Sequence, residues 1–139
     1  MPVTQQQVNA EAAKPLPYFS HDNNAAEDIK CQRLLVRGGF EAYGRWWRVC
    51  ELMAMYTGHK VPFSTEEDFF ILAKQLMFDD EQKLIEFIKL LADVGLISSE
   101  ALGNGEIVSD RMNANAQTIG KQRAAGLLGG RPKKKSNDE

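Results

Sequence analysis

The segment from Phe40 to Thr57 constrains the fold of this chain more than any other part of the sequence. Its apolar side chains recur at spacings of three and four along two adjacent stripes, one with Phe40, Tyr43, Trp47, Cys50 and Ala54, the other with Trp46, Val49, Met53 and Tyr56. An apolar arc this wide predicts a central helix that is buried around most of its circumference. Because consecutive residues do not share a face, we expect Trp47 in the core and Trp46 at a subunit interface.

Caps, glycines and apolar periodicity predict the elements around this helix. A first helix is capped by Asp22, Asn23 or Asn24 and ends at Gly38-Gly39. Ser64-Thr65-Glu66-Glu67 predicts a capping box, and Asp79-Asp80-Glu81-Gln82 repeats the cap pattern. In chain order we expect a helix from about 24 to 37, the central helix 40–57, a short extended segment 61–63, a helix to 76, a helix to 94, a β-hairpin with strands 96–98 and 107–109 around Asn104-Gly105, and a last helix capped by Asp110.

This succession predicts a mainly α fold, namely a winged helix: a helix-turn-helix with a small β-hairpin wing, plus an N-terminal and a C-terminal helix. We assign residues 18–110 to the winged-helix domain and 111–128 to the C-terminal helix. Residues 1–17 are Gln- and Ala-rich, contain three prolines and lack apolar periodicity, which predicts a disordered arm. Residues 129–139 are expected to form a basic disordered tail.

Charge divides the chain into two unequal parts. Residues 1–110 hold 10 Lys and Arg against 17 Asp and Glu, a net charge of −7, whereas residues 111–137 hold 7 Lys and Arg and no acid. An acidic body with a basic extension favours a polyanionic partner for the extension.

The surface with which a helix-turn-helix reads DNA is acidic in this sequence. In such domains the second helix enters the major groove and basic side chains meet phosphates and base edges. The helix that ends near Val94 offers Asp79, Asp80, Glu81, Glu86 and Asp93 against Lys83 and Lys89, and the expected wing offers Glu100 and Glu106. We therefore expect this surface to meet protein or solvent rather than DNA.

The last helix and the tail are the better candidates for DNA contact. The candidate residues are Arg111, Lys121, Arg123, Arg131, Lys133, Lys134 and Lys135. Gly130-Arg131-Pro132 followed by lysines is similar to the core of an AT-hook, in which an extended Arg lies in the minor groove. The Arg that usually precedes that Gly is replaced by Gly129, so the motif is incomplete. A solubilising tail and a generic polyanion-binding arm are the alternatives.

A second group of cations is a secondary candidate for DNA contact. Its members are Lys30, Arg33, Arg37, Arg45 and Arg48, which share stripes of the first two helices. The alternative is that they form ordinary surface ion pairs with neighbouring carboxylates.

No pattern of catalytic or metal-ligating residues is evident, so we expect a non-enzymatic protein without metal or cofactor. His21, Cys31, Cys50 and His59 are ligand types, but their spacing matches no zinc motif. The two cysteines are expected to be reduced. No apolar run approaches the roughly 20 residues of a membrane span, and the N-terminus has no apolar signal core, so we expect a cytoplasmic protein without membrane contact.

The sequence also resembles a known family. The residues that carry the resemblance are Tyr18-Phe19-Ser20-His21-Asp22, Gly39-Phe40-Glu41-Ala42-Tyr43-Gly44-Arg45-Trp46-Trp47, Glu51 and the Val94-Gly95-Leu96-Ile97 segment. They are similar to winged-helix domains of bacteriophage and mobile-element replication proteins, which are related to the N-terminal domain of the DnaD primosome component. Ser20, Ala42 and Trp46 depart from the family pattern, and larger members carry a further domain.

The resemblance implies a replication-associated module that binds DNA or assembles. We expect a phage or mobile-element protein that contacts DNA mainly through its basic C-terminal helix and tail. Its other expected partners are replication proteins or further copies of itself. The alternatives are a protein-interaction or oligomerisation module without DNA binding, or a winged-helix transcriptional regulator.

Overall fold

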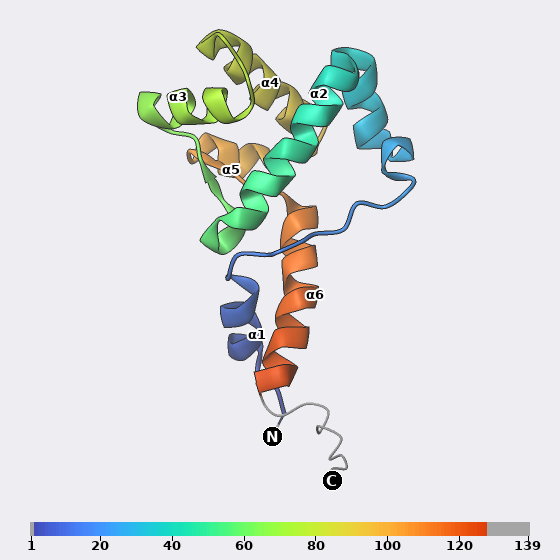
Figure 1. Cartoon of the computed structure of the whole chain (residues 1–139), viewed down its shortest axis with the longest axis vertical. Helices are drawn as coiled ribbons and strands as arrows, with labels where there is room; N and C mark the ends of the chain where they lie inside the picture. The colour runs from blue at the N-terminus through green and yellow to red at the C-terminus, as the bar shows by residue number, and fades with distance from the viewer. Residues whose placement is uncertain (1, 128–139) are drawn as a thin grey trace.

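The computed structural model describes residues 2–127 and is mainly helical there, as the sequence predicts. Its elements are α1 (Gln5–Ala12), α2 (Ile29–Met55), β1 (Val61–Pro62), α3 (Glu66–Gln75), α4 (Glu81–Asp93), α5 (Ser99–Gly103), β2 (Glu106–Ile107) and α6 (Asp110–Leu127). Helices α2 to α5 gather into one mass, while α6 extends away from it with α1 alongside (Figure 1). We call residues 25–109 the body, and residues 4–16 with 110–127 the stalk.

Helix α2 joins the two helices that the sequence predicts on either side of Gly38-Gly39. Gly39 has φ 72° and ψ −171°, a conformation that residues with a Cβ rarely adopt, and the helix axis turns sharply there (Figure 1). The predicted break is therefore present as a kink. The predicted cap is wrong, because the carboxylate of Asp28 accepts from the N–H of Lys30 and residues 25–27 form a separate 3-10 turn.

Helices α3 and α4 are confirmed, with a one-residue correction to the cap of each. The hydroxyl of Thr65, not that of Ser64, accepts from the N–H of Asp68 at 3.1 Å. The Asp68 carboxylate accepts from the N–H groups of Ser64 and Thr65, and these bonds hold its pKa below the usual range. Asp80, not the expected Asp79, caps α4, because its carboxylate accepts from the N–H groups of Gln82 and Lys83.

The predicted β-hairpin is replaced by a short helix and a different strand pair. β2 pairs antiparallel with β1, with Val61 opposite Ile107. Helix α5 forms in the intervening segment because the Ser98 hydroxyl accepts from the N–H of Ala101 and caps it. Gly105, which was expected in a hairpin turn, instead ends that helical segment at φ 82°.

Large apolar side chains from α2, α3 and α4 fill the body. Those that are at most 2% exposed include Leu34, Trp46, Val49, Leu52, Met53, Leu72, Leu76, Leu84, Ile88 and Leu91. Trp46 is only 2% exposed, and Trp47 is half-buried beside it. The expectation that Trp47 rather than Trp46 lies in the core is therefore wrong, because α2 turns Trp46 toward the core.

The N-terminal arm predicted as disordered contains helix α1. Thr4 and Gln7 form a capping box at its start, and its Val8 and Ala12 are buried against α6. Periodicity did not reveal this helix because its buried side chains are few and small. The predicted C-terminal helix is present as α6, which ends at Leu127 within the described residues, but Asp110 does not cap it: the hydroxyl of Ser109 accepts from the N–H of Met112. In residues 2–127, no helix is both long enough and apolar enough to cross a lipid bilayer.

Candidate nucleic-acid interface

Arg111, the first candidate for DNA contact, lies where the stalk leaves the body. Its guanidinium forms an ion pair with Asp22 at 3.5 Å and lies 5.8 Å from the centre of the Trp47 ring. The side chain is 42% exposed. Both partners belong to the two segments that carry the family resemblance, so Arg111 joins those segments to α6 while keeping part of its guanidinium exposed to solvent.

Trp47 is the centre of an aromatic cluster between these segments. The His21 ring stacks on it at 3.5 Å with an interplanar angle of 9°, and Phe19 is nearly parallel at 6.1 Å. Tyr43 meets it edge-on. Because His21 covers a face of the indole, that face is not available to stack on a nucleic-acid base.

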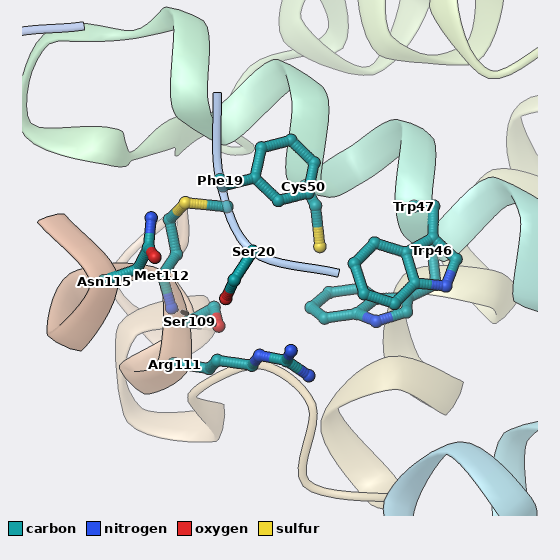
Figure 2. A pocket seen from close by; sticks show the side chains of 9 residues that line it. All are labelled: Phe19, Ser20, Trp46, Trp47, Cys50, Ser109, Arg111, Met112 and Asn115. Carbon is teal, nitrogen blue, oxygen red and sulfur yellow. Dashed lines mark hydrogen bonds between the residues drawn. The ribbon is translucent and has the colours of Figure 1, made fainter. Parts of the chain in front are cut away.

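A small cavity lies beside this cluster (Figure 2). It is lined by Phe19, Ser20, Trp46, Trp47, Cys50, Ser109, Arg111, Met112 and Asn115, and its volume is about 10 Å³. That volume is close to the roughly 10–15 Å³ that one water molecule needs, so a nucleobase would not fit. Two buried donors, Trp47 Nε1 and Asn115 Nδ2, have no hydrogen-bond partner among residues 2–127.

The two cysteines near this region are buried thiols. Burial raises the pKa of Cys50 and of Cys31 above the ordinary thiol value. A protonated thiol is a weak nucleophile and a poor metal ligand. Within the part of the chain that the structure describes, no three His, Cys, Asp or Glu side chains form a group that could hold a metal ion.

The other described candidates on α6 differ in whether their side chains already form hydrogen bonds within the chain. Lys121 is exposed. Arg123 donates to the carbonyl oxygens of Glu11 and Pro15 at 3.4 and 3.3 Å, which ties α6 to the N-terminal segment. The candidates Arg131, Lys133, Lys134 and Lys135 lie outside the described residues.

The secondary candidates for DNA contact on α2 differ in the groups that they contact. Arg45 donates to the carbonyl oxygens of Leu76 and Met77 and lies 3.9 Å from the centre of the Phe78 ring, so it stabilises the turn between α3 and α4. Its ion pair with Glu41, and those of Arg48 with Glu51 and Arg37 with Asp93, agree with the alternative of surface pairing. Lys30 and Arg33 are exposed.

The acidic surface predicted for α4 is present. Asp79, Asp80, Glu81, Glu86 and Asp93 are all exposed, and Lys83 is drawn to Asp79 at 3.4 Å. The sequence did not reveal that Asp22 and Trp47 meet at Arg111, or that His21 stacks on Trp47. The sequence signal that could have suggested these contacts is that His21-Asp22 and Trp46-Trp47 belong to the same family motif.

The aromatic cluster also lies within the segment that matches a known family. The family described as Lin1244/Lin1753-like, N-terminal, matches residues 18–111, which is about two thirds of the chain. No curated protein and no solved structure matches the sequence. The chain therefore belongs to the Lin1244/Lin1753-like N-terminal domain family, which is associated with phages and mobile elements.

Proposed function

We propose that the chain is a replication-associated DNA-binding and assembly module of a phage or mobile element. It contacts DNA mainly through α6 and the basic residues that follow, and it assembles with further copies or with replication proteins through its body. It is a binding protein, without catalysis and without a cofactor. In this proposal the body is a winged-helix domain related to the N-terminal domain of the DnaD primosome component.

The distribution of charge over body and stalk carries the proposal. Residues 25–109 contain 9 Lys and Arg against 14 Asp and Glu, whereas the stalk contains 4 against 2. Residues 128–137 add four cations and no acid. Because α6 extends away from the acidic body (Figure 1), a duplex beside its end is separated from most of the carboxylates that would repel it.

The arrangement of α3 and α4 supports the winged-helix part of the proposal. The two helices follow each other through a short turn, and β2 then returns to pair with β1. In such a domain α4 would be the recognition helix. Its exposed carboxylates oppose phosphate binding, so the proposal assigns the α3–α4 side to protein contact and leaves DNA to the stalk.

Salt dependence of DNA binding tests the proposal. If about 4–7 cations meet phosphates, log K should fall against log salt with a slope of about −4 to −6 on duplex DNA. Replacement of Arg131, Lys133, Lys134 and Lys135 by Gln should make the slope shallower by about 3 to 4. The matched control is Lys83→Gln with Lys89→Gln on α4, which should leave affinity and slope nearly unchanged. A four-Gln variant that binds like the wild type, with the same slope, would refute DNA contact through the tail.

A protein-interaction module without DNA binding is the second candidate. The exposed apolar side chains of α2 and α3 favour it, since such side chains mark association surfaces when they cluster. Sedimentation of the chain alone and with a short duplex at low salt distinguishes the two candidates. If the chain assembles and no duplex sediments with it, the protein-interaction module without DNA binding is supported. The acidic α4 disfavours a transcriptional regulator, which needs sequence preference.

A further inference from the structure

The first half of α2 presents an apolar hollow with a basic rim. Ile29 and Val36 are 56% and 85% exposed. Together with Gln32, Arg33 and Arg37 they line a hollow of about 280 Å³, which we call the basic hollow. Arg33 has no ion-pair partner among residues 2–127, and Arg37 is half-exposed beside Asp93. An exposed apolar patch with a polar rim is typical of a protein contact.

Helix α3 presents the opposite kind of surface. Phe70 and Ile71 are 61% and 47% exposed. Glu66 and Glu67 lie one turn before them, are exposed and have no ion-pair partner in the described part of the chain. We call these four residues the acidic ridge. Lys74 lies one turn after them, 4.7 Å from the centre of the Phe70 ring.

The charges of the two surfaces match in one orientation. If the helices run antiparallel, Glu66 and Glu67 meet the Arg33 and Arg37 end of the hollow, while Lys74 meets Glu27 and Asp28 at the start of α2. At about 1.5 Å per residue, Lys74 lies roughly 11 Å along α3 from Glu66 and Glu67. The Asp28 cap precedes the midpoint of Arg33 and Arg37 by a similar length of α2, so both contacts form together. The parallel orientation would bring like charges together, which fixes the direction of docking.

We propose that the basic hollow of one copy of this chain receives the acidic ridge of a second copy. The inference rests on the self-assembly part of the proposed function and assigns its surfaces. α3 and the first half of α2 lie on opposite sides of the body in Figure 1, so one copy does not close the contact by itself. Because the two surfaces differ, the contact is head-to-tail. A bound pair still has one free hollow and one free ridge, so further copies can add to it and form rings or open chains.

Complementary blocking variants test this contact. Val36→Asp disrupts only the hollow, and Phe70→Asp disrupts only the ridge. Full-length protein, freed of nucleic acid, is followed by sedimentation velocity over a wide concentration range. The wild type should grow beyond a dimer, and each variant should be monomeric because association weakens roughly tenfold or more. An equimolar mixture of the two variants should form a dimer and nothing larger, because one intact hollow and one intact ridge remain.

Two further variants control for nonspecific effects. Met55→Asp changes a side chain that is 62% exposed but lies outside both surfaces, and it should assemble like the wild type. Arg33→Glu and Glu67→Arg should each weaken assembly, whereas the double variant should regain part of it because the opposite charges are restored. Circular dichroism verifies that each exposed substitution leaves the fold intact.

The outcomes separate this contact from the wider function. A wild type that stays monomeric would overturn both the contact and self-assembly, whatever the salt titration of DNA binding shows. A wild type that assembles while Val36→Asp and Phe70→Asp assemble equally well would overturn the contact alone. Loss of assembly in only one of the two variants would also overturn it, because a head-to-tail contact needs both surfaces.

Discussion

The body and the stalk are held together by different kinds of side chain. In the body, Trp46, Leu52 and Leu84 belong to a core of large residues that are almost fully buried. In the stalk, α1 and α6 meet through small residues, namely Val8 and Ala12 on α1 and Ala116, Gly120 and Ala124 on α6. The body therefore depends on apolar area, and the stalk depends on how closely two backbones approach.

A few hydrogen bonds join the two parts. The N–H of Leu16 donates to the carbonyl oxygen of Ala54, and the N–H of Gly58 donates to that of Ala13, both at 2.7 Å. His59 Nε2 lies 3.1 Å from the carbonyl oxygen of Lys14. Leu16 and Met112 also reach the core of the body. The rest of the stalk is held by small side chains and a few hydrogen bonds, so α1 and the end of α6 should open at lower free energy than the body unfolds.

The largest expected effect is a cavity in the body. Leu52 is 1% exposed, and Leu52→Ala should lower the free energy of unfolding by about 2–5 kcal/mol. Met55 lies three residues later on the same helix and is 62% exposed, so Met55→Ala should change stability by less than about 0.5 kcal/mol. Urea unfolding at 25 °C measures both. Equal effects of the two substitutions would show that the body does not depend on its core in this way.

The body was largely predictable because its signals are strong and local. The wide apolar arc of α2, the glycines at its kink and the Asp79-Asp80 segment before α4 all act within one or two turns, although the cap itself lies one residue later than expected. The hairpin was wrong because Asn104-Gly105 is compatible both with a hairpin turn and with the end of a helix. The Ser98 cap decided between them by stabilising α5.

The stalk and the site were less predictable, for a physical reason. Burial of Ala and Gly leaves little apolar periodicity, so α1 resembled a disordered arm in composition. The cluster around Arg111 joins the start of α6 to residues that are far away in the chain: Asp22 lies 89 residues earlier and Trp47 lies 64 residues earlier. Such contacts depend on the fold, which sequence spacing does not encode. The sequence shows which candidate side chains are positively charged, but it does not show which groups they contact in the fold.

A smaller effect should separate stalk from body. A Cβ added at Gly120 would lie 2.7 Å from the Val8 carbonyl oxygen and 2.9 Å from the Ala12 nitrogen. Backbone atoms do not move aside like a side chain, so Gly120→Ala should destabilise the α1–α6 contact by about 1–3 kcal/mol. The gain in helix propensity, about 0.5–1 kcal/mol, offsets part of this. Hydrogen exchange should show faster exchange of the α1 amides and unchanged protection of α4.

Gly126→Ala is the matched control on the same helix. Among residues 2–127, an added Cβ there meets nothing within 4 Å, so only the gain in helix propensity applies. We expect unchanged protection of α1 and a slight increase in protection of α6. If Gly120→Ala protected α1 as well as the wild type does, close backbone approach would not be what holds the stalk.

The subtlest expected effect is a pH dependence at the joint between body and stalk. Burial lowers the pKa of His59, with Arg123 acting in the same direction, while the hydrogen bond to the Lys14 carbonyl opposes it. The unfolded chain then binds a proton more readily than the folded chain. The ionisation of His59 therefore does not change the free energy of unfolding above about pH 6.5. As the pH falls from there toward the lower pKa of the folded state, protonation of His59 lowers the free energy of unfolding.

Urea unfolding between pH 5 and pH 8, compared in the wild type and His59→Asn, checks this dependence. Asn tolerates the left-handed conformation of residue 59, which has φ 58°, so the substitution removes the titrating ring without forcing the backbone. The loss of stability on acidification should become shallower in this variant. His21 is the other histidine of the chain, and His21→Gln identifies any share that belongs to it. Since His59 contacts the stalk through Lys14, exchange of the α1 amides should accelerate before that of α4 as the pH falls. Simultaneous acceleration in both helices would mean that the histidine reports on the body as a whole rather than on the joint.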